Sequence, residues 1–195
     1  MTVAGLLLTL AAGAGAGAAP TPAVPDTVCI VMRTDSLPLD SRESPLDSLS
    51  FTVGGYPVKV CYGRPSVRGR PVFGALVPYR VIWRTGANEP TMIHTMRAIR
   101  IAGIAVQPGS YSIYTIPGEH RWELIVNRAT SQWGHESNYT DDVRAQEVGR
   151  SVVPSESAER YTEQLTFRAS PAAAGVTVLS LHWERTVVAI PVTPG

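Results

Sequence analysis

Three arginines alternate with glycine and proline in segment 62–74, which interrupts a strand-like pattern. Glycine and proline hold a loop in a defined shape, while guanidinium groups and exposed backbone N–H groups bind anions. The segment therefore predicts an anion-binding loop whose contacts are Arg64, Ser66, Arg68 and Arg70. The alternative is that these arginines pair with Asp and Glu of neighbouring strands and fasten the loop in place.

A second segment, 83–91, brings an aromatic ring, a guanidinium, a hydroxyl, an amide and a carboxylate into one turn. One stacking ring beside several planar hydrogen-bonding groups is typical of a carbohydrate or peptide site. The candidate ligand-binding residues are Trp83, Arg84, Thr85, Asn88 and Glu89. The alternative is a structural corner, in which the Asn88 side chain bonds the backbone of the turn and Glu89 pairs with an arginine.

No motif in the chain identifies a reaction. Ser66 lacks the Gly-x-Ser-x-Gly context of a nucleophile elbow, and Glu89 has no evident second carboxylate at the spacing of about 5–10 Å that a glycosidase needs. The histidines are scattered, without the close spacing of metal ligands, at His94, His120, His135 and His182. No cofactor or metal is expected. A hydrolase with Glu89 as acid or base and a structural envelope protein remain alternatives to a binding protein.

The composition fits one soluble domain. The chain has 195 residues, of which 44% are hydrophobic and 17% charged, and its net charge is +1. This balance gives no reason to expect nucleic acid or an anionic membrane as a partner. The two candidate segments favour a small polar or anionic ligand, such as a glycan or a cell-wall fragment, as the partner. Lys59 is the only lysine. The arginine bias reflects either binding of carboxylates and phosphates or a GC-rich genome. The sequence predicts no oligomeric state.

The N-terminus has the pattern of a signal peptide over residues 1–19. Its apolar run, 3–12, is shorter than the roughly 20 residues that span a bilayer, and Ala16-Gly17-Ala18 fits a cleavage site. No Lys or Arg precedes the run, and Cys29 lies outside a lipobox context. We therefore expect an exported protein, periplasmic or secreted, without a membrane span or a lipid anchor.

The chain has two cysteines, Cys29 and Cys61. In an exported protein they indicate a disulfide, which would stabilise the fold by about 3–4 kcal/mol in the chain-entropy model. Both lie in apolar, β-branched surroundings, where two buried thiols would fit equally well.

After the leader, the chain reads as about ten short strands separated by Gly, Pro, Asp and Ser turns. The expected strands are 27–32, 50–53, 58–62, 79–83, 91–96, 98–101, 110–116, 122–127, 143–148, 161–168, 176–183 and 186–192. A turn of helix is expected only near 155–161. The pattern predicts an all-β, antiparallel β-sandwich or jelly-roll-like fold. We expect a Pro/Ser/Asp-rich segment with one possible strand at 20–48 and a single sandwich domain at 49–192.

Both candidate segments also carry a family resemblance. The stretch Cys-Tyr-Gly-Arg-Pro-Ser-Val-Arg-Gly-Arg, the following Phe-Gly and Leu-Val-Pro-Tyr, and then Trp-Arg-Thr-Gly-Ala-Asn-Glu resemble the bacterial exported domain-of-unknown-function family 2911. The resemblance covers roughly residues 45–192 and implies a secreted or periplasmic β-rich domain, with no activity attached. Pro90 and His94 depart from the residues expected at their positions, so His94 is a poor candidate for a family-wide mechanism.

Overall fold

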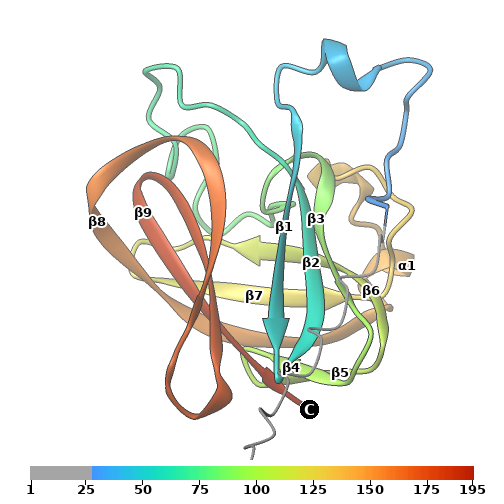
Figure 1. Ribbon diagram of the computed structural model, residues 1–195. Coiled ribbons are helices and arrows are strands. Elements are labelled where there is room, and N and C mark those ends of the chain that lie inside the picture. Colours follow the sequence, from blue (N-terminus) through green and yellow to red (C-terminus); the bar gives the residue numbers. More distant parts are fainter. Residues whose placement is uncertain (1–27) are drawn as a thin grey trace, which may run out of the picture.

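The structure is a computed structural model that describes residues 28–195, in which nine antiparallel strands form one continuous sheet (Figure 1). The strands are β1 (Leu46–Val53), β2 (Tyr56–Gly63), β3 (Ala87–Thr95), β4 (Ile99–Ile101), β5 (Ile104–Val106), β6 (Gly109–Ile116), β7 (Arg121–Asn127), β8 (Glu147–Pro171) and β9 (Thr177–Pro194). Their order in the sheet is β1-β2-β3-β6-β7-β8-β9-β4-β5. The predicted all-β antiparallel sandwich is confirmed, whereas this order does not establish a jelly roll.

Helical structure in the described part of the chain is limited to short pieces. They are α1 (Asp141–Arg144) and the 3-10 turns η1 (Leu39–Ser41), η2 (Glu136–Asn138) and η3 (Ala173–Gly175). Within residues 28–195, no helix is long and apolar enough to cross a membrane. The predicted signal peptide lies outside the described residues.

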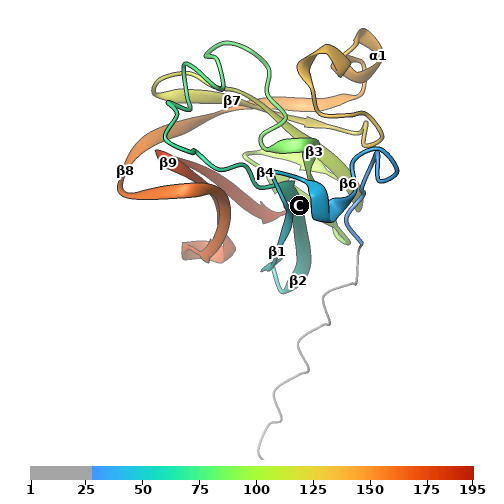
Figure 2. The ribbon, with the colours of Figure 1, turned by 90° about the horizontal axis from the view of Figure 1, so that it is seen from above.

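The long strand β8 turns the sheet back on itself. Its first part pairs with β7, from Glu147 to Pro154, and its remainder pairs with β9 from Ser155 onward. Strand β9 in turn pairs with β4, and β1 contacts both β8 and β9. Figures 1 and 2 show the β8–β9 hairpin curling across from β1 and β2. The two halves therefore face each other and enclose one core.

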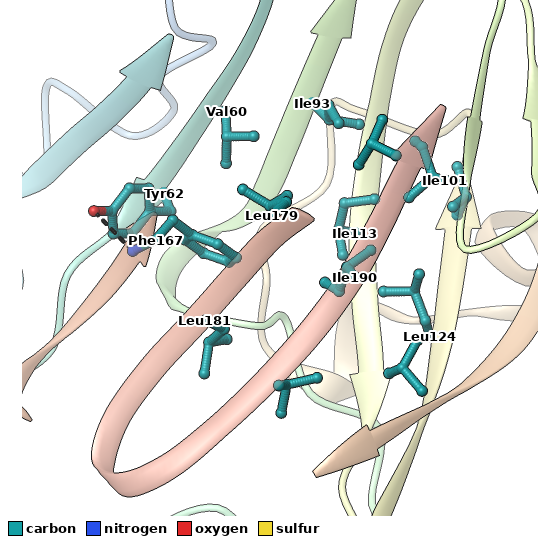
Figure 3. Packing of buried hydrophobic residues seen from close by; sticks show 14 of the residues in the cluster. Val60, Tyr62, Ile93, Ile101, Ile113, Leu124, Phe167, Leu179, Leu181 and Ile190 are labelled. Carbon is teal, nitrogen blue, oxygen red and sulfur yellow. Dashed lines mark hydrogen bonds between the residues drawn. The ribbon is translucent and has the colours of Figure 1, made fainter. Parts of the chain in front are cut away.

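The core lies between these halves (Figure 3). Strand β9 contributes every second residue, so that Leu179, Leu181 and Trp183 are buried, because successive side chains of a strand point to opposite faces. Tyr62 and Phe167 meet edge to face at 4.8 Å, and the Tyr62 hydroxyl accepts the Phe167 backbone N–H at 3.3 Å. Full burial of one large apolar side chain contributes about 1.5–3 kcal/mol. The alternation of apolar residues therefore determines which face of a strand is turned toward the core.

The first hairpin follows its turn signal. Strands β1 and β2 pair from Leu46↔Gly63 to Val53↔Tyr56 around Gly54 and Gly55. Both glycines have positive φ, 57° and 81°, as a two-residue hairpin turn of matching twist requires. The expected strands 50–53 and 58–62 are thus the two arms of this hairpin.

Several expected elements are wrong. Residues 155–161 are strand rather than helix, because pairing of β8 with β9 outweighs a local capping signal. Residues 28–32 and 79–83 are not strands; the latter makes only an isolated bridge, Trp83↔Thr115. The expected strand 143–148 begins as α1 and enters β8 only at Glu147.

The described N-terminal residues, 28–42, form a strap tied to the sheet by Cys29 and Arg42. Cys29 forms a disulfide with Cys61 of β2, with the two Cα atoms 5.7 Å apart. Of the two alternatives that the sequence left open, the structure has the disulfide. The backbone groups of Met32 bond side chains and not a neighbouring strand, since its N–H donates to Glu89 and its carbonyl accepts from Arg42. This explains why 28–32 is not a strand.

Candidate functional site

The arginine-rich loop 62–74 is held against β8 by its own side chains. Arg64 donates to the Leu165 carbonyl at 3.2 Å and to the Thr166 hydroxyl at 3.1 Å, and lies 3.5 Å from Asp47. The Ser66 hydroxyl accepts from Gln164 at 3.2 Å. These two predicted ligand contacts therefore already have partners within the fold.

The other two arginines of the loop are exposed and also engaged. Arg68 pairs with Glu43 at 3.0 Å, and its backbone N–H donates to Glu163. Arg70 donates to the carbonyls of Val67 and Ser66, each at 3.0 Å, so it stabilises the shape of its own loop. Arg70 has no carboxylate partner among the described residues.

The second segment, 83–91, is a strained turn that leads into β3. Thr85 and Asn88 both have positive φ, 57° and 63°, and a β-branched residue rarely adopts this conformation. The strain is held by hydrogen bonds: the Thr85 hydroxyl lies 3.1 Å from that of Thr115, and its carbonyl accepts from Thr91 at 2.8 Å. Asn88 donates to the Ser44 carbonyl at 2.9 Å. Strain of this kind concentrates at functional sites.

Glu89 has a structural environment, in which its carboxylate is bonded within the protein. Its side chain is 4% exposed and receives Arg42 in a two-pronged ion pair, at 2.8 Å and 3.1 Å. The Met32 N–H donates to the same carboxylate at 2.7 Å. Both carboxylate oxygens are thus bonded within the protein. Glu89 therefore anchors the strap, and its carboxylate does not face a space in which it could act on a substrate as an acid or base.

Arg84 is the opposite case in the same turn. It is half-buried, and within residues 28–195 no group makes a hydrogen bond or ion pair with its guanidinium. Burial lowers the pKa of Arg84, and the negative charge of Glu136 only partly opposes this effect. Its stem packs on Gly134, where an added Cβ would lie 2.5 Å from the Arg84 Cδ. Arg84 is therefore a positioned, partly desolvated charge that lacks a counter-ion in contact.

Arg84 lies in the wall of a cavity between the two segments. The cavity has a volume of about 410 Å³, within the usual range of small-molecule sites. Its lining residues are Glu43, Ser44, Pro65, Arg70, Leu76, Val77, Pro78, Val81, Ile82, Trp83, Arg84, Gly86, Ala87, Gly134, Glu136 and Trp183. The predicted residues Arg70, Trp83 and Arg84 come together here, and Thr85, Asn88 and Glu89 do not line it.

Arg64 and Ser66 instead face a second, shallower depression along β8. It also takes in Arg160, Tyr161 and Arg168. The predicted loop site is thus divided between two surfaces, and Arg68 lines neither of them. No group of His, Cys, Asp or Glu within residues 28–195 is arranged to hold a metal ion.

Sequence reasoning missed the residues that complete the cavity. Glu136 and Gly134 come from the loop after β7, and the apolar wall comes from 76–82 and from Trp183 of β9. It also missed Arg42, the partner of Glu89. The sequence offers one local signal for this part of the cavity, a glycine directly after Trp133 in a segment without strand alternation.

The fold is thus a small antiparallel β-sandwich, and a cavity lined by Arg70 and Arg84 lies between the loop 62–74 and the turn 83–91. Residues 44–192 match the model of a family described as protein of unknown function (DUF2911), and the chain belongs to this family. Comparisons with curated proteins and with solved structures gave no match.

Proposed function

We propose that this protein binds a small polar or anionic ligand in the cavity between the loop 62–74 and the turn 83–91. The observation that carries the proposal is Arg84, a half-buried guanidinium without a hydrogen bond or ion pair among residues 28–195, in the wall of a cavity of about 410 Å³. A buried charge without a partner is costly, and a ligand anion would supply that partner.

Two contacts support a positioning role for the surrounding backbone. Gly134 donates its N–H to the Asn88 carbonyl at 3.1 Å and leaves space for the Arg84 stem. The Thr91 N–H donates to the Arg84 carbonyl at 3.0 Å. The guanidinium is thus carried by a backbone that is fixed before any ligand arrives, which lowers the entropic cost of binding.

A thermal-shift screen of sugars and organic acids tests the proposal. A ligand present at 100 times its Kd raises Tm by roughly 5–10 °C for a domain of this size. Arg84→Met keeps the apolar stem on Gly134 but removes the charge, so we expect it to abolish the ligand-induced shift. The matched control is Arg168→Met, an exposed arginine in the other depression, which should retain the shift.

A purely structural role is the second candidate, and Arg64 and Glu89 favour it. Both are held by partners inside the fold. A wild-type protein that gives no hit in the screen, or a hit that survives in Arg84→Met, would replace the binding role with this one. The hydrolase alternative has no support, because the Glu89 carboxylate is bonded to Arg42 and does not line the cavity.

We also propose that the protein acts outside the cytoplasm. The Cys29–Cys61 disulfide supports this location, since disulfides persist in oxidising compartments. Mass spectrometry of extracellular or periplasmic protein should find a mature N-terminus between Ala19 and Val24. Cytoplasmic protein that retains residues 1–19 would overturn this location.

A further inference from the structure

The cavity beside Arg84 combines a polar part, which includes Arg84, with an apolar part. The apolar part of its lining comprises Leu76, Val77, Pro78, Val81 and Ile82, together with Trp83 and Trp183. A polyhydroxylated sugar needs hydrogen-bonding partners around most of its perimeter, and the side chains of this apolar part offer none. The apolar body of a ligand would instead gain from leaving water.

The Trp83 ring is not an open platform for a sugar. Its indole N–H donates to the Gly86 carbonyl at 3.1 Å. Its plane lies 16° from that of Trp183, with the ring centroids 5.9 Å apart, and it meets Phe73 edge to face. Trp83 is therefore a packed part of the cavity wall, integrated in the aromatic core.

Most charged groups of the wall are already engaged. Glu43 pairs with Arg68, and Arg70 bonds carbonyls of its own loop. Glu136 is exposed and lies 3.4 Å from His135. Arg84 is the half-buried charge of the wall, and its guanidinium has no bonding partner in the described part of the chain. The Arg84 guanidinium, next to the apolar residues 76–82, therefore favours a ligand with one anionic group and an apolar body.

We infer that the cavity takes a small carboxylate with an apolar body, aromatic or branched, whose carboxylate pairs with Arg84 and whose body contacts the 76–82 wall, next to Trp83 and Trp183. This inference rests on the proposed function and narrows its ligand class. The planar fork of arginine matches the two oxygens of a carboxylate, which gives the pair its geometry.

The test uses the whole chain and matched probes in calorimetry. The carboxylates are 3-phenylpropanoate, hexanoate and benzoate, the neutral isostere is 3-phenylpropan-1-ol, and the sugar is N-acetylglucosamine. We expect at least one carboxylate to bind, and its alcohol or sugar counterparts to bind at least tenfold more weakly. Arg84→Met should lose at least tenfold in carboxylate affinity, Arg84→Lys should lose less, and Arg168→Met should be unchanged.

Indole N–H signals of the tryptophans locate the probe. Trp83 and Trp183 lie in the cavity wall, whereas Trp133 lies under Arg33, with the Arg33 Cζ 4.5 Å from its ring centroid. Among the residues that the structure describes, the Trp183 Nε1 has no hydrogen-bond partner. Bound carboxylate should shift the nuclear magnetic resonance signals of Trp83 and Trp183 and leave that of Trp133 in place.

The outcomes separate the two levels of the proposal. Tight binding of the sugar or the alcohol, with Trp83 and Trp183 shifts, overturns the carboxylate inference and leaves a binding function. If none of the three carboxylates binds at millimolar concentration while another ligand from the screen does, the carboxylate inference is also overturned and the binding function is retained. Failure of every ligand class overturns both.

Discussion

Arg84 and Glu89 belong to the same turn, yet the fold treats the two charges in opposite ways. Glu89 is buried and fully bonded to Arg42 and the Met32 amide, whereas the Arg84 guanidinium has no bonding partner among residues 28–195. The loop 62–74 repeats the first pattern, since Arg64 is held by Leu165, Thr166 and Asp47. A charged residue in an irregular segment is thus structural or available for binding according to which segments the fold brings beside it.

The largest effect should follow from breaking the Glu89–Arg42 pair. We expect Glu89→Gln to lower the free energy of unfolding by about 3–5 kcal/mol, because the Arg42 charge is then buried without compensation. Urea denaturation measures the loss. Glu163→Gln, an exposed carboxylate that accepts the Arg68 N–H, is the matched control and should lose less than about 1 kcal/mol.

The double variant Arg42→Met/Glu89→Leu sharpens this test. Replacing a buried ion pair by apolar residues is often neutral, so the double variant should regain most of the stability that Glu89→Gln loses. Equal stability of wild type and Glu89→Gln would contradict the buried pair and place Glu89 in the same class as Arg84.

The next effect concerns the strap that carries Arg42. We expect Cys29→Ala/Cys61→Ala to lower the free energy of unfolding by about 2–4 kcal/mol, since the disulfide closes a separation of 32 residues. Amide hydrogen exchange should also rise at Met32, whose N–H is held by Glu89. Wild-type protein treated with reductant should reproduce both changes, and unaltered stability after reduction would show that Arg42 anchors the strap alone.

A smaller effect, the dependence of stability on pH, comes from His94, a buried side chain with a hydrogen-bond partner at one of its two ring nitrogens. His94 lies 2.7 Å from the Ser110 hydroxyl through Nδ1, and its Nε2 has no partner in the described region. Burial lowers the pKa of His94 below 6.5, and the charge of Lys59 lowers it further. The unfolded chain therefore takes up the proton first, so stability is full above pH 6.5 and falls as the pH drops toward the folded-state pKa.

The variant His94→Asn tests that fall. Asparagine keeps a polar atom near Ser110 but does not titrate, so the loss of unfolding free energy between pH 8 and pH 5 should shrink, as measured by urea denaturation at each pH. Burial also lowers the pKa of His182, so His182 makes a second, separate contribution to the change of unfolding free energy with pH. An unchanged slope in His94→Asn would remove His94 from this account.

The smallest expected changes in stability are those of Arg64→Met and Arg84→Met, which compare the two arginines directly. Arg64→Met should cost about 1 kcal/mol, because it removes two hydrogen bonds and a partly exposed ion pair. Arg84→Met should change stability by no more than about 0.5 kcal/mol, or stabilise the protein, because it removes a desolvated charge. A loss in Arg84→Met larger than that in Arg64→Met would reverse the comparison and assign Arg84 to the scaffold.

Much of the sheet was predictable because its signals are local. The Gly54-Gly55 turn and the alternation of Leu179, Leu181 and Trp183 each follow from a few neighbouring residues. The failures, at 28–32, 79–83 and 155–161, are places where a distant partner decides the conformation. The ligand-binding role expected of the turn 83–91 stays a prediction, and the different environments of Arg84 and Glu89 have no signal in the local sequence.

The sequence by itself determined an all-β chain, its family and two segments rich in binding groups, since residue type and short-range period carry that information. Only the tertiary structure decided that Arg42 neutralises Glu89, that the loop 62–74 is fastened to β8, and that Arg84 opens into a cavity. The physical reason is that the cost of a charge depends on its desolvation and its partners. Both are set by segments far away along the chain, which meet only when β8 folds the sheet over its core.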